Sequence, residues 1–329
     1  MKRIFASDIE LSLEVNKNTE KSAWIRNEDT FVKKERLIKS VVKDKVHSNS
    51  RGILFNNGGG AYVDIGNHLE ACTPECSGIF DAIKYEEATI LECAKLLERH
   101  PEAEIFLNNL DFDGETFGAH QNFSTSINQK KRNALLLPCI IEKLWSSSGR
   151  FHRDGTFELS QRASSLEEAI GEGTMQDRAI LNTRDENHSG NPPKIYRFHH
   201  ISNDALRCQG GNLLTRGMMH IFLTLLENNL LPDFDYIGDK KISELESKKI
   251  AVRDIKSLSK QPHSWAIESM PAEQRSAIKI AEKYLEVAKT EFYKQSSDID
   301  FTIDLCRNTL EKLARYETEP HILVGRLDW

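Results

Sequence analysis

Residues 3–10 read Arg3-Ile4-Phe5-Ala6-Ser7-Asp8-Ile9-Glu10, and this stretch decides how the rest of the chain is interpreted. Alternate residues of a β-strand point to opposite faces of a sheet. Asp8 and Glu10 would therefore share one face, opposite to Ile9. The pattern predicts a strand over residues 2–10 that places two carboxylates side by side.

The same spacing of two recurs at other predicted strands. Pairs of polar residues that would share a face are Tyr62 with Asp64, His120 with Asn122, and Arg197 with His199, and Glu70 follows nearby. Strands carrying such pairs would form an acidic face, which is costly to bury unless it binds cations. Carboxylates with a few imidazoles suit Mg²⁺ or Mn²⁺ better than structural zinc. Taken singly, each residue is better explained as solvent-exposed, and the joint pattern makes a site and an exposed face about equally good explanations.

Arginines form a second group. Arg162 follows Ser160-Gln161, Arg184 lies in the run 182–188, and Arg197 lies in a predicted strand. Guanidinium groups bind phosphate or carboxylate oxygens in bidentate fashion. Acidic residues for metal and arginines for phosphate are the two parts of a phosphate-transfer site. Taken alone, residues 183–187 are better explained as a charged turn held by local ion pairs.

The order of predicted elements indicates the fold class. Strands are expected over 61–65, 70–73, 105–110, 120–124, 157–161, 179–182 and 195–201, with a tight turn at 56–60, a loop at 16–30, and helices over 31–46, 81–99, 126–147 and 211–228. Strands do not alternate one-for-one with helices, so the fold is predicted to be α+β. Beyond Pro232 the pattern is mainly helical. We therefore predict a catalytic domain over 1–235 and a helical extension over 236–329.

Composition excludes several classes of protein. Lys and Arg total 44 against 50 Asp and Glu, which gives a formal charge of −6 and argues against a nucleic-acid-binding surface. No apolar run reaches the ~18 residues of a membrane span. The first residues lack the apolar core of a signal peptide, and six cysteines are spread thinly along the chain. A cytoplasmic protein with no membrane or nucleic-acid partner is expected.

Five further stretches have the order and spacing of a known family. They are Asn57-Gly58-Gly59-Gly60-Ala61-Tyr62-Val63-Asp64, His68-Leu69-Glu70-Ala71-Cys72-Thr73-Pro74-Glu75-Cys76, Gly118-Ala119-His120-Gln121-Asn122-Phe123, Leu159-Ser160-Gln161-Arg162-Ala163, and residues 180–188. With residues 3–10, they resemble the family of the Pup ligase and the Pup deamidase/depupylase. That family belongs to the glutamine-synthetase-like carboxylate–amine ligases.

The resemblance implies a curved antiparallel sheet, backed by helices, that holds ATP and Mg²⁺. By position, the residues around the metal ions would be Asp8, Glu10, Tyr62, Glu70, His120 and His199. Arg162 and Arg184 would bind the phosphate and the reacting carboxylate, and Arg197 would assist in nucleotide binding. Asp64 matches the family's catalytic aspartate and is the expected general base.

The implied reaction joins the γ-carboxylate of a glutamate-ended peptide, such as a Pup-like tag, to an amine such as a protein lysine. The alternatives are a deamidase or depupylase on the same scaffold, a ligase that acts on a small peptide or amino acid, and a non-catalytic tag-binding homologue. Residues 11–56 leave no room for the extra loop that the depupylase carries before the Asn-Gly hairpin. The ligase is therefore favoured.

The sequence departs from the family pattern at several positions. Asp8 replaces Glu, Gly60 replaces Arg and Gln121 replaces Glu, while Leu69 and Ala71 replace Pro and Tyr. These changes bear on substrate specificity more than on phosphate chemistry. The family also continues beyond the segment that ends here at Trp329, into a small C-terminal domain. We expect either a truncated chain or a partner chain that completes the fold.

Overall fold

The computed structural model describes residues 3–15, 52–64, 68–100, 103–111, 114–174, 176–185, 195–234, 236, 244–260, 264–316, 318–323 and 327–329. The predicted loop 16–30 and helix 31–46 lie outside these residues. The strands are β1 (Phe5–Val15), β2 (Gly52–Leu54), β3 (Gly60–Val63), β4 (Leu69–Cys72), β5 (Ala103–Phe106), β6 (Ala119–Thr125), β7 (Arg150–Phe151), β8 (Phe157–Glu158), β9 (Glu168–Gly171), β10 (Ala179–Asn182) and β11 (Tyr196–His200). The α-helices are α2 (Ile79–Leu96), α3 (Leu136–Ile141), α4 (Gln209–Glu227), α5 (Glu244–Lys260), α6 (Ala277–Phe292) and α7 (Ser297–Leu313).

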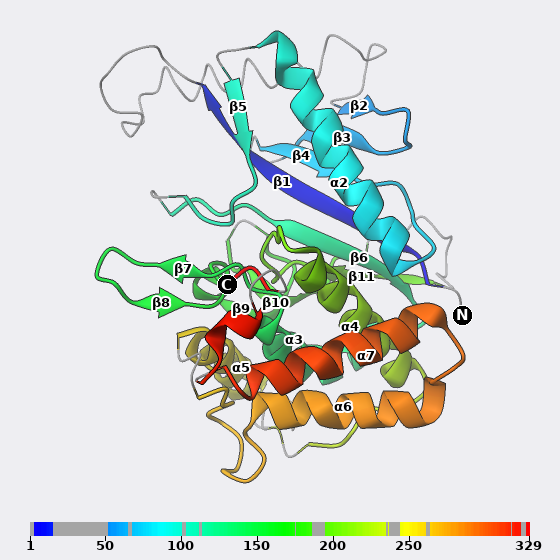
Figure 1. Cartoon of the computed structure of the whole chain (residues 1–329), viewed down its shortest axis with the longest axis vertical. Coiled ribbons are helices and arrows are strands. Elements are labelled where there is room, and N and C mark those ends of the chain that lie inside the picture. Colours follow the sequence, from blue (N-terminus) through cyan, green and yellow to red (C-terminus); the bar gives the residue numbers. More distant parts are fainter. Residues whose placement is uncertain are drawn as a thin grey trace.

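Nine strands form one sheet in the order β2-β3-β4-β1-β6-β11-β10-β9, and β5 pairs with the second half of β1 (Figure 1). Neighbours are antiparallel except β9 and β10, which are parallel. The predicted α+β class and the antiparallel character of the sheet are confirmed. β9 was not predicted, because its four residues carry no alternation of polar and apolar side chains. β1 lies between β4 and β6, so the predicted opening strand is central to the sheet.

One face of the sheet is apolar and is covered by helices. α2 lies across β1 and β4 (Figure 1), and it buries Ile79, Ala82 and Cys93, which recur at helical spacing. Phe5 and Phe123 meet edge to face on this side of the sheet, with ring centroids 5.7 Å apart. Burial of this face is the main favourable contribution to folding, at about 25 cal/mol per Å² of apolar surface.

The C-terminal helices share the hydrophobic core with α3 and α4. Phe222 of α4 meets Tyr284 of α6 with ring centroids 5.0 Å apart, and Ile303 of α7 belongs to the same buried cluster. The helical character predicted for residues 236–329 is confirmed by α5, α6 and α7. The division into two domains at residue 235 stays a prediction. Among the described residues, no helix is both long enough and apolar enough to cross a membrane.

The helix predicted over residues 126–147 is wrong in detail. A 3₁₀ segment (Gln129–Leu135), the short α3, and a second 3₁₀ segment (Glu142–Leu144) replace it. Pro138 falls in the first turn of α3, where its missing N–H breaks no helical hydrogen bond. Pro138 therefore limits where α3 can begin. It does not lie inside a continuous helix over residues 126–147.

Candidate functional site

The strand register brings the predicted residues onto one face of the sheet. Tyr62 pairs with Glu70, and Glu70 pairs with Glu10, across β3, β4 and β1. Residues directly opposite each other in antiparallel strands have side chains on the same face. The face formed in this way carries Tyr62, Glu70, Cys72, Asp8, Glu10, His120, Asn122, Arg197, His199 and Asn182. We call it the polar face, and it is opposite to the helix-covered face.

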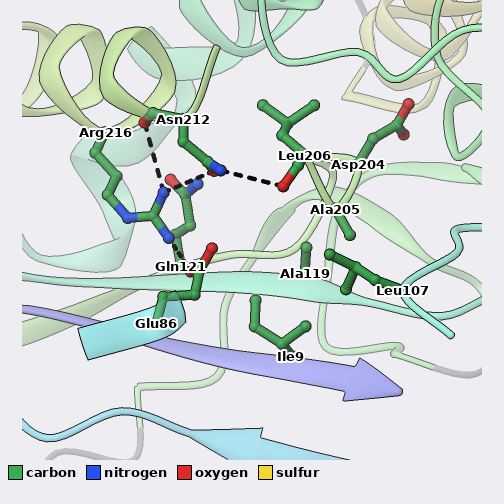
Figure 2. Close-up of a pocket in the computed structure, with 10 residues that line it drawn as sticks. All are labelled: Ile9, Glu86, Leu107, Ala119, Gln121, Asp204, Ala205, Leu206, Asn212 and Arg216. Carbon is green, nitrogen blue, oxygen red and sulfur yellow. Dashed lines mark hydrogen bonds and ion pairs between the residues drawn. The ribbon is translucent and has the colours of Figure 1, made fainter. Parts of the chain in front are cut away.

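A small cavity lies on the other side of the sheet (Figure 2). Ile9 and Ala119 line it, and their side chains alternate with those of Glu10 and His120. Arg216 and Asn212 of α4 project into it, and the volume of about 10 Å³ suits about one water molecule. This cavity is therefore part of the packing between sheet and helices and is separate from the polar face.

Glu10 is the most heavily contacted acid on the polar face. The backbone N–H of Gly118 donates to its Oε2 at 2.5 Å, His68 Nδ1 lies 3.3 Å from the same oxygen, and His120 Nε2 lies 3.9 Å from Oε1. Burial alone would raise the pKa of Glu10. The hydrogen bond from His68 and the charges of Arg162 and His68 outweigh burial and lower this pKa to about 2. Glu10 is therefore ionised at neutral pH, which is the form that suits a cation.

Glu70 shows how much negative charge the face concentrates. Burial and the charges of Asp8, Glu10 and Asp64 together raise its pKa to about 8, against a hydrogen bond from Tyr62 that lowers it. Burial and the neighbouring Glu70 likewise raise the pKa of the Tyr62 phenol, which stays neutral. A divalent cation beside Glu70 would relieve this repulsion and return the carboxyl group to its ionised form.

Two histidines complete the row of candidate ligands. His120 and His199 meet edge to face with ring centroids 5.1 Å apart. Burial lowers the pKa of both imidazoles, and nearby arginines lower them further. Neither ring nitrogen of His199 has a hydrogen-bond partner among the described residues, although both are buried. A neutral, unpartnered imidazole is suited to bind a metal ion.

Arg162 is buried at 2 % exposure and faces the acidic residues of the site. Its Nη2 donates to the Ile201 carbonyl at 3.4 Å, whereas Nε and Nη1 have no hydrogen-bond partner within the described ranges. Burial lowers the pKa of this guanidinium, and the charge of Glu10 opposes that shift. A buried cation with two unused donor atoms is suited to bind an anionic group.

The other two predicted arginines have different surroundings. Arg197 donates from Nε to Asn122 Oδ1 at 2.7 Å, and its Nη2 lies 3.5 Å from Asp8 Oδ2. Arg197 is thus joined to the acidic cluster itself. The backbone N–H of Arg184 donates to Asn182 Oδ1 at 2.9 Å, and the positive charge of Arg184 is close enough to lower the pKa of His199.

Asp64 lies just beyond the end of β3 and is paired with a histidine that was missing from the predicted site. Its Oδ1 accepts the backbone N–H of His68 at 2.6 Å, and its Oδ2 lies 3.7 Å from His68 Nδ1. Burial opposes protonation of His68, but hydrogen bonds with Glu10 and Glu115 raise its pKa to about 10. His68 falls in the segment between β3 and β4, where no periodicity marks it.

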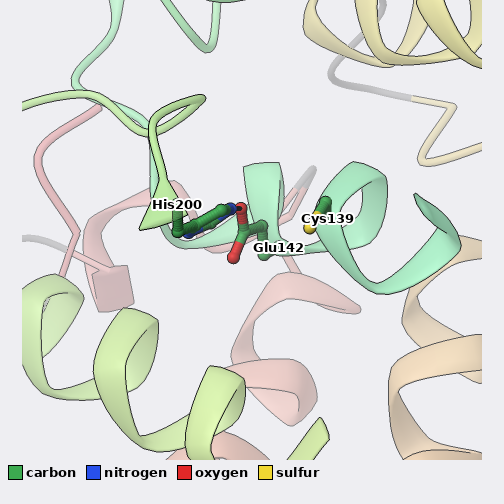
Figure 3. Close-up of side chains that lie close together, drawn as sticks. All are labelled: Cys139, Glu142 and His200. Atoms are coloured by element: carbon green, nitrogen blue, oxygen red, sulfur yellow. Dashed lines mark ion pairs between the residues drawn. The ribbon is translucent and has the colours of Figure 1, made fainter. Parts of the chain in front are cut away.

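A second group of possible metal ligands lies in the core (Figure 3). Cys139, Glu142 and His200 are fully buried, and one ligand atom of each lies within 4.8 Å of the others. His200 Nε2 lies 2.8 Å from Glu142 Oε1, and Lys143 Nζ lies 3.8 Å from the same oxygen. The positive charge of Lys143 already balances Glu142. We therefore interpret this cluster as a buried ion-pair network.

Comparison with known proteins shows the family. The Pup-ligase protein family matches residues 5–329. This chain belongs to that family. The Pup–protein ligase of Acidimicrobium ferrooxidans is 28 % identical over 302 residues, covering 85 % of this chain and 63 % of the relative. That of Kineococcus radiotolerans is 28 % identical over 303 residues with the same coverage. The chain thus spans less than two thirds of the length of these Pup-ligase relatives.

Solved structures support the Pup-ligase fold. The ligase PafA in its complex with the prokaryotic ubiquitin-like protein Pup superposes with a TM-score of 0.75 at 21 % identity, over 100 % of this chain and 67 % of that one. PafA in complex with ADP gives a TM-score of 0.68 at 20 % identity, over 96 % and 70 %. These structures agree in fold, and the match of the family model confirms the family identified from the sequence motifs.

Proposed function

We propose that this chain is an ATP-dependent ligase that joins a glutamyl γ-carboxylate to an amine through an isopeptide bond. Membership of the Pup-ligase family supports this proposal, as do relatives named Pup–protein ligase. PafA is described in complexes with Pup and with ADP. The observation that carries the proposal for this chain is a set of buried nitrogens beside the acidic face, Nε and Nη1 of Arg162 and both ring nitrogens of His199, that no described residue contacts by a hydrogen bond.

The polar face fits Mg²⁺. We assign Asp8, Glu10, Tyr62, Glu70, His120 and His199 to the metal ions, because no described residue bonds to either ring nitrogen of His199 and because a cation would offset the charge that raises the pKa of Glu70. Bound Mg²⁺ would neutralise the charge that develops on the transferred phosphoryl group. Tyr62 contributes as a neutral oxygen donor, because the pKa of its phenol is raised.

The arginines suit the substrate anions. Arg162, Arg184 and Arg197 are assigned to nucleotide binding, and Arg162 has donors that no described residue uses. A γ-carboxylate oxygen attacks the γ-phosphorus of ATP, ADP leaves, and an acyl phosphate forms. Arg162 and Arg184 are assigned to bind the phosphoryl and carboxylate oxygens, whose charge is greatest in the transition state.

Asp64 is assigned the proton-transfer step. A lysine amine is almost fully protonated at neutral pH, so a base must remove a proton before the nitrogen attacks the acyl carbon. The nitrogen then forms the amide bond, and inorganic phosphate leaves with the electrons of the broken carbon–oxygen bond. Asp64 lies at the rim of the polar face, with 15 % of its side chain exposed, and the amine would approach from there.

The test measures ADP formation from Mg-ATP in the presence of a peptide ending in glutamate, with and without a lysine-containing acceptor. Mass spectrometry should find a product lighter by one water than the sum of peptide and amine. Release of ammonia from a glutamine-ended peptide without ADP would instead establish the deamidase. If neither reaction occurs although the folded protein binds the peptide, the tag-binding alternative holds and the ligase proposal fails.

A further inference from the structure

Asp204 is a buried carboxylate outside the set of residues assigned above. It lies after the end of β11 and is 2 % exposed. Its Oδ1 accepts the Ser160 hydroxyl at 2.9 Å and the Arg162 backbone N–H at 3.1 Å. Its Oδ2 accepts the Gln161 N–H at 3.0 Å, and both the N–H and the hydroxyl of Ser148 at 2.9 and 3.0 Å. Three consecutive residues thus fold around one side chain.

We propose that Asp204 is a positioning residue that fixes the Arg162 guanidinium on the polar face. This inference rests on the proposed function. The Arg162 side chain has a single long hydrogen bond, to the Ile201 carbonyl. Its placement therefore depends on its backbone, and Asp204 is the side chain that accepts the Arg162 N–H. A guanidinium must be placed to within a fraction of an ångström to bind a phosphoryl group in the transition state.

The donor set explains why a carboxylate is needed at this position. Three of the five donors are backbone N–H groups, and they are distributed over both carboxylate oxygens. An asparagine would offer one acceptor oxygen and one NH₂ group. In either orientation of the amide, at least one backbone N–H would face another donor. Asp204→Asn should therefore disturb the loop while it preserves the size of the side chain.

The loop has a second anchor that does not involve Asp204. On its other side, Ser259 of α5 accepts the Ser160 N–H at its hydroxyl and the Leu159 N–H at its carbonyl, at 3.0 and 2.8 Å. This anchor is expected to keep the loop folded when Asp204 is replaced. It also supplies a control, because Ser259→Ala weakens the loop without touching the acceptor of the Arg162 N–H.

A double-mutant cycle separates positioning from general support of the fold. ADP formation is measured for wild type, Asp204→Asn, Arg162→Ala and the double variant, with Mg-ATP and a glutamate-ended peptide. Asp204→Asn should lower kcat/KM at least about tenfold in the presence of Arg162 and less than about twofold in its absence. Ser259→Ala should lower the melting temperature with less than about a twofold change in kcat/KM.

An equal loss from Asp204→Asn with and without Arg162, or no loss at all, would overturn the inference. Should Asp204→Asn not fold, Ser160→Ala takes its place in the cycle, because it removes the other donor to Oδ1 and is expected to show the same dependence on Arg162. If the wild type forms no ADP, the proposed function fails. A crystal structure of Asp204→Asn then still decides the inference, since an unmoved Arg162 guanidinium contradicts it.

Discussion

Arg162 and Arg216 are both buried arginines, but their guanidinium groups have different surroundings. Arg216 of α4 forms an ion pair with Glu86 of α2 and donates to Ser7 Oγ at 2.9 Å. Arg162 has two nitrogens without a partner among the described residues. An unpaired buried cation lowers stability, so its retention indicates a role toward a ligand.

Substitution of these two arginines should separate activity from stability. Arg162→Ala should lower ADP formation by about 10²–10³-fold, because it removes a donor to the developing phosphoryl charge. Its free energy of unfolding should stay equal or rise. Arg216→Ala is the matched control and should cost about 3–5 kcal/mol of stability, since it leaves Glu86 buried and unpaired. Kinetics and denaturant unfolding measure both. A large loss of stability in Arg162→Ala would contradict the assignment.

Asp64 provides a second test at this scale. Asp64→Asn keeps an oxygen to accept the His68 N–H but removes the base, so Mg-ATP binding should be nearly unchanged while isopeptide formation falls about 10²–10⁴-fold. Glu115→Gln is the control, because it removes a nearby charge that contacts the other nitrogen of His68. Product formation is followed by mass spectrometry. Near-normal turnover in Asp64→Asn would show that another group is the base.

At the scale of elements, strand pairing and close backbone approach form the site. Gly118 precedes β6 and donates its N–H to Glu10, and a Cβ atom added there would clash with His120 Nε2 and crowd Glu10 Oε1. Both affected groups are candidate metal ligands with little freedom to move. The absence of a side chain at residue 118 is therefore a condition for the metal site.

Gly118→Ala should raise the Mg²⁺ concentration needed for half-maximal activity by about tenfold or more, because it displaces a ligand that must be placed within a fraction of an ångström. Gly171→Ala is a matched strand substitution in the same sheet. Its added Cβ meets the end of the flexible Glu168 side chain, which can rotate away. Titration with Mg²⁺ compares the two variants, and equal Mg²⁺ requirements would refute the steric argument.

The contact between Arg3, which precedes β1, and His220 of α4 predicts a dependence of stability on pH. Arg3 Nε donates to His220 Nδ1 at 2.8 Å, and burial together with the Arg3 charge lowers the pKa of His220 to about 3. The unfolded chain binds this proton near pH 6.5 and the folded chain does not. Stability is therefore retained above pH 6.5 and falls by up to about 1.4 kcal/mol per pH unit below it.

The variant His220→Gln keeps an acceptor for Arg3 but cannot take up the proton. Its free energy of unfolding should decline less between pH 7 and pH 5 than that of the wild type. Urea unfolding at the two pH values measures the difference. Identical pH slopes would show that the pKa of His220 is not lowered in the folded protein.

At the scale of the whole molecule, the last residues connect separate parts of the fold. Trp329 donates from its indole N–H to the Leu144 carbonyl at 3.1 Å, and its ring packs on Trp265 and Tyr316. Asp328 accepts the N–H groups of Arg207 and Cys208, where α4 begins. Through these contacts the last residues pack against the buried cluster that also contains the apolar residues of α4.

Trp329→Ala should cost about 2–3 kcal/mol, below the ~3–5 kcal/mol of a fully buried tryptophan, because part of the ring stays exposed. Trp329→Phe is the control and should recover most of the loss, since it keeps an aromatic ring against Trp265. Thermal unfolding measures both variants. Equal melting temperatures for wild type and Trp329→Ala would show that the contact contributes nothing.

The sequence by itself determined the strands of the polar face. Alternation with a period of two is a local property, so it indicated that Asp8 shares a strand face with Glu10, and Arg197 with His199, before any strand was paired. The ordered motifs likewise identified the family, because they resemble those of the Pup ligase over most of the chain. Neither result required knowledge of which strands are neighbours.

Only the tertiary structure decided which groups meet. The strand register aligns Glu70 with Glu10, and His68 lies between Asp64 and Glu10. Residues 160–162 fold around Asp204, which is about 40 residues away in the sequence. Contacts of this kind cannot be found from a local pattern. Local patterns fix the faces of single strands, but contacts between segments depend on the packing of the whole core. The charge states at the site follow from the same packing, because burial and neighbouring charges set each pKa.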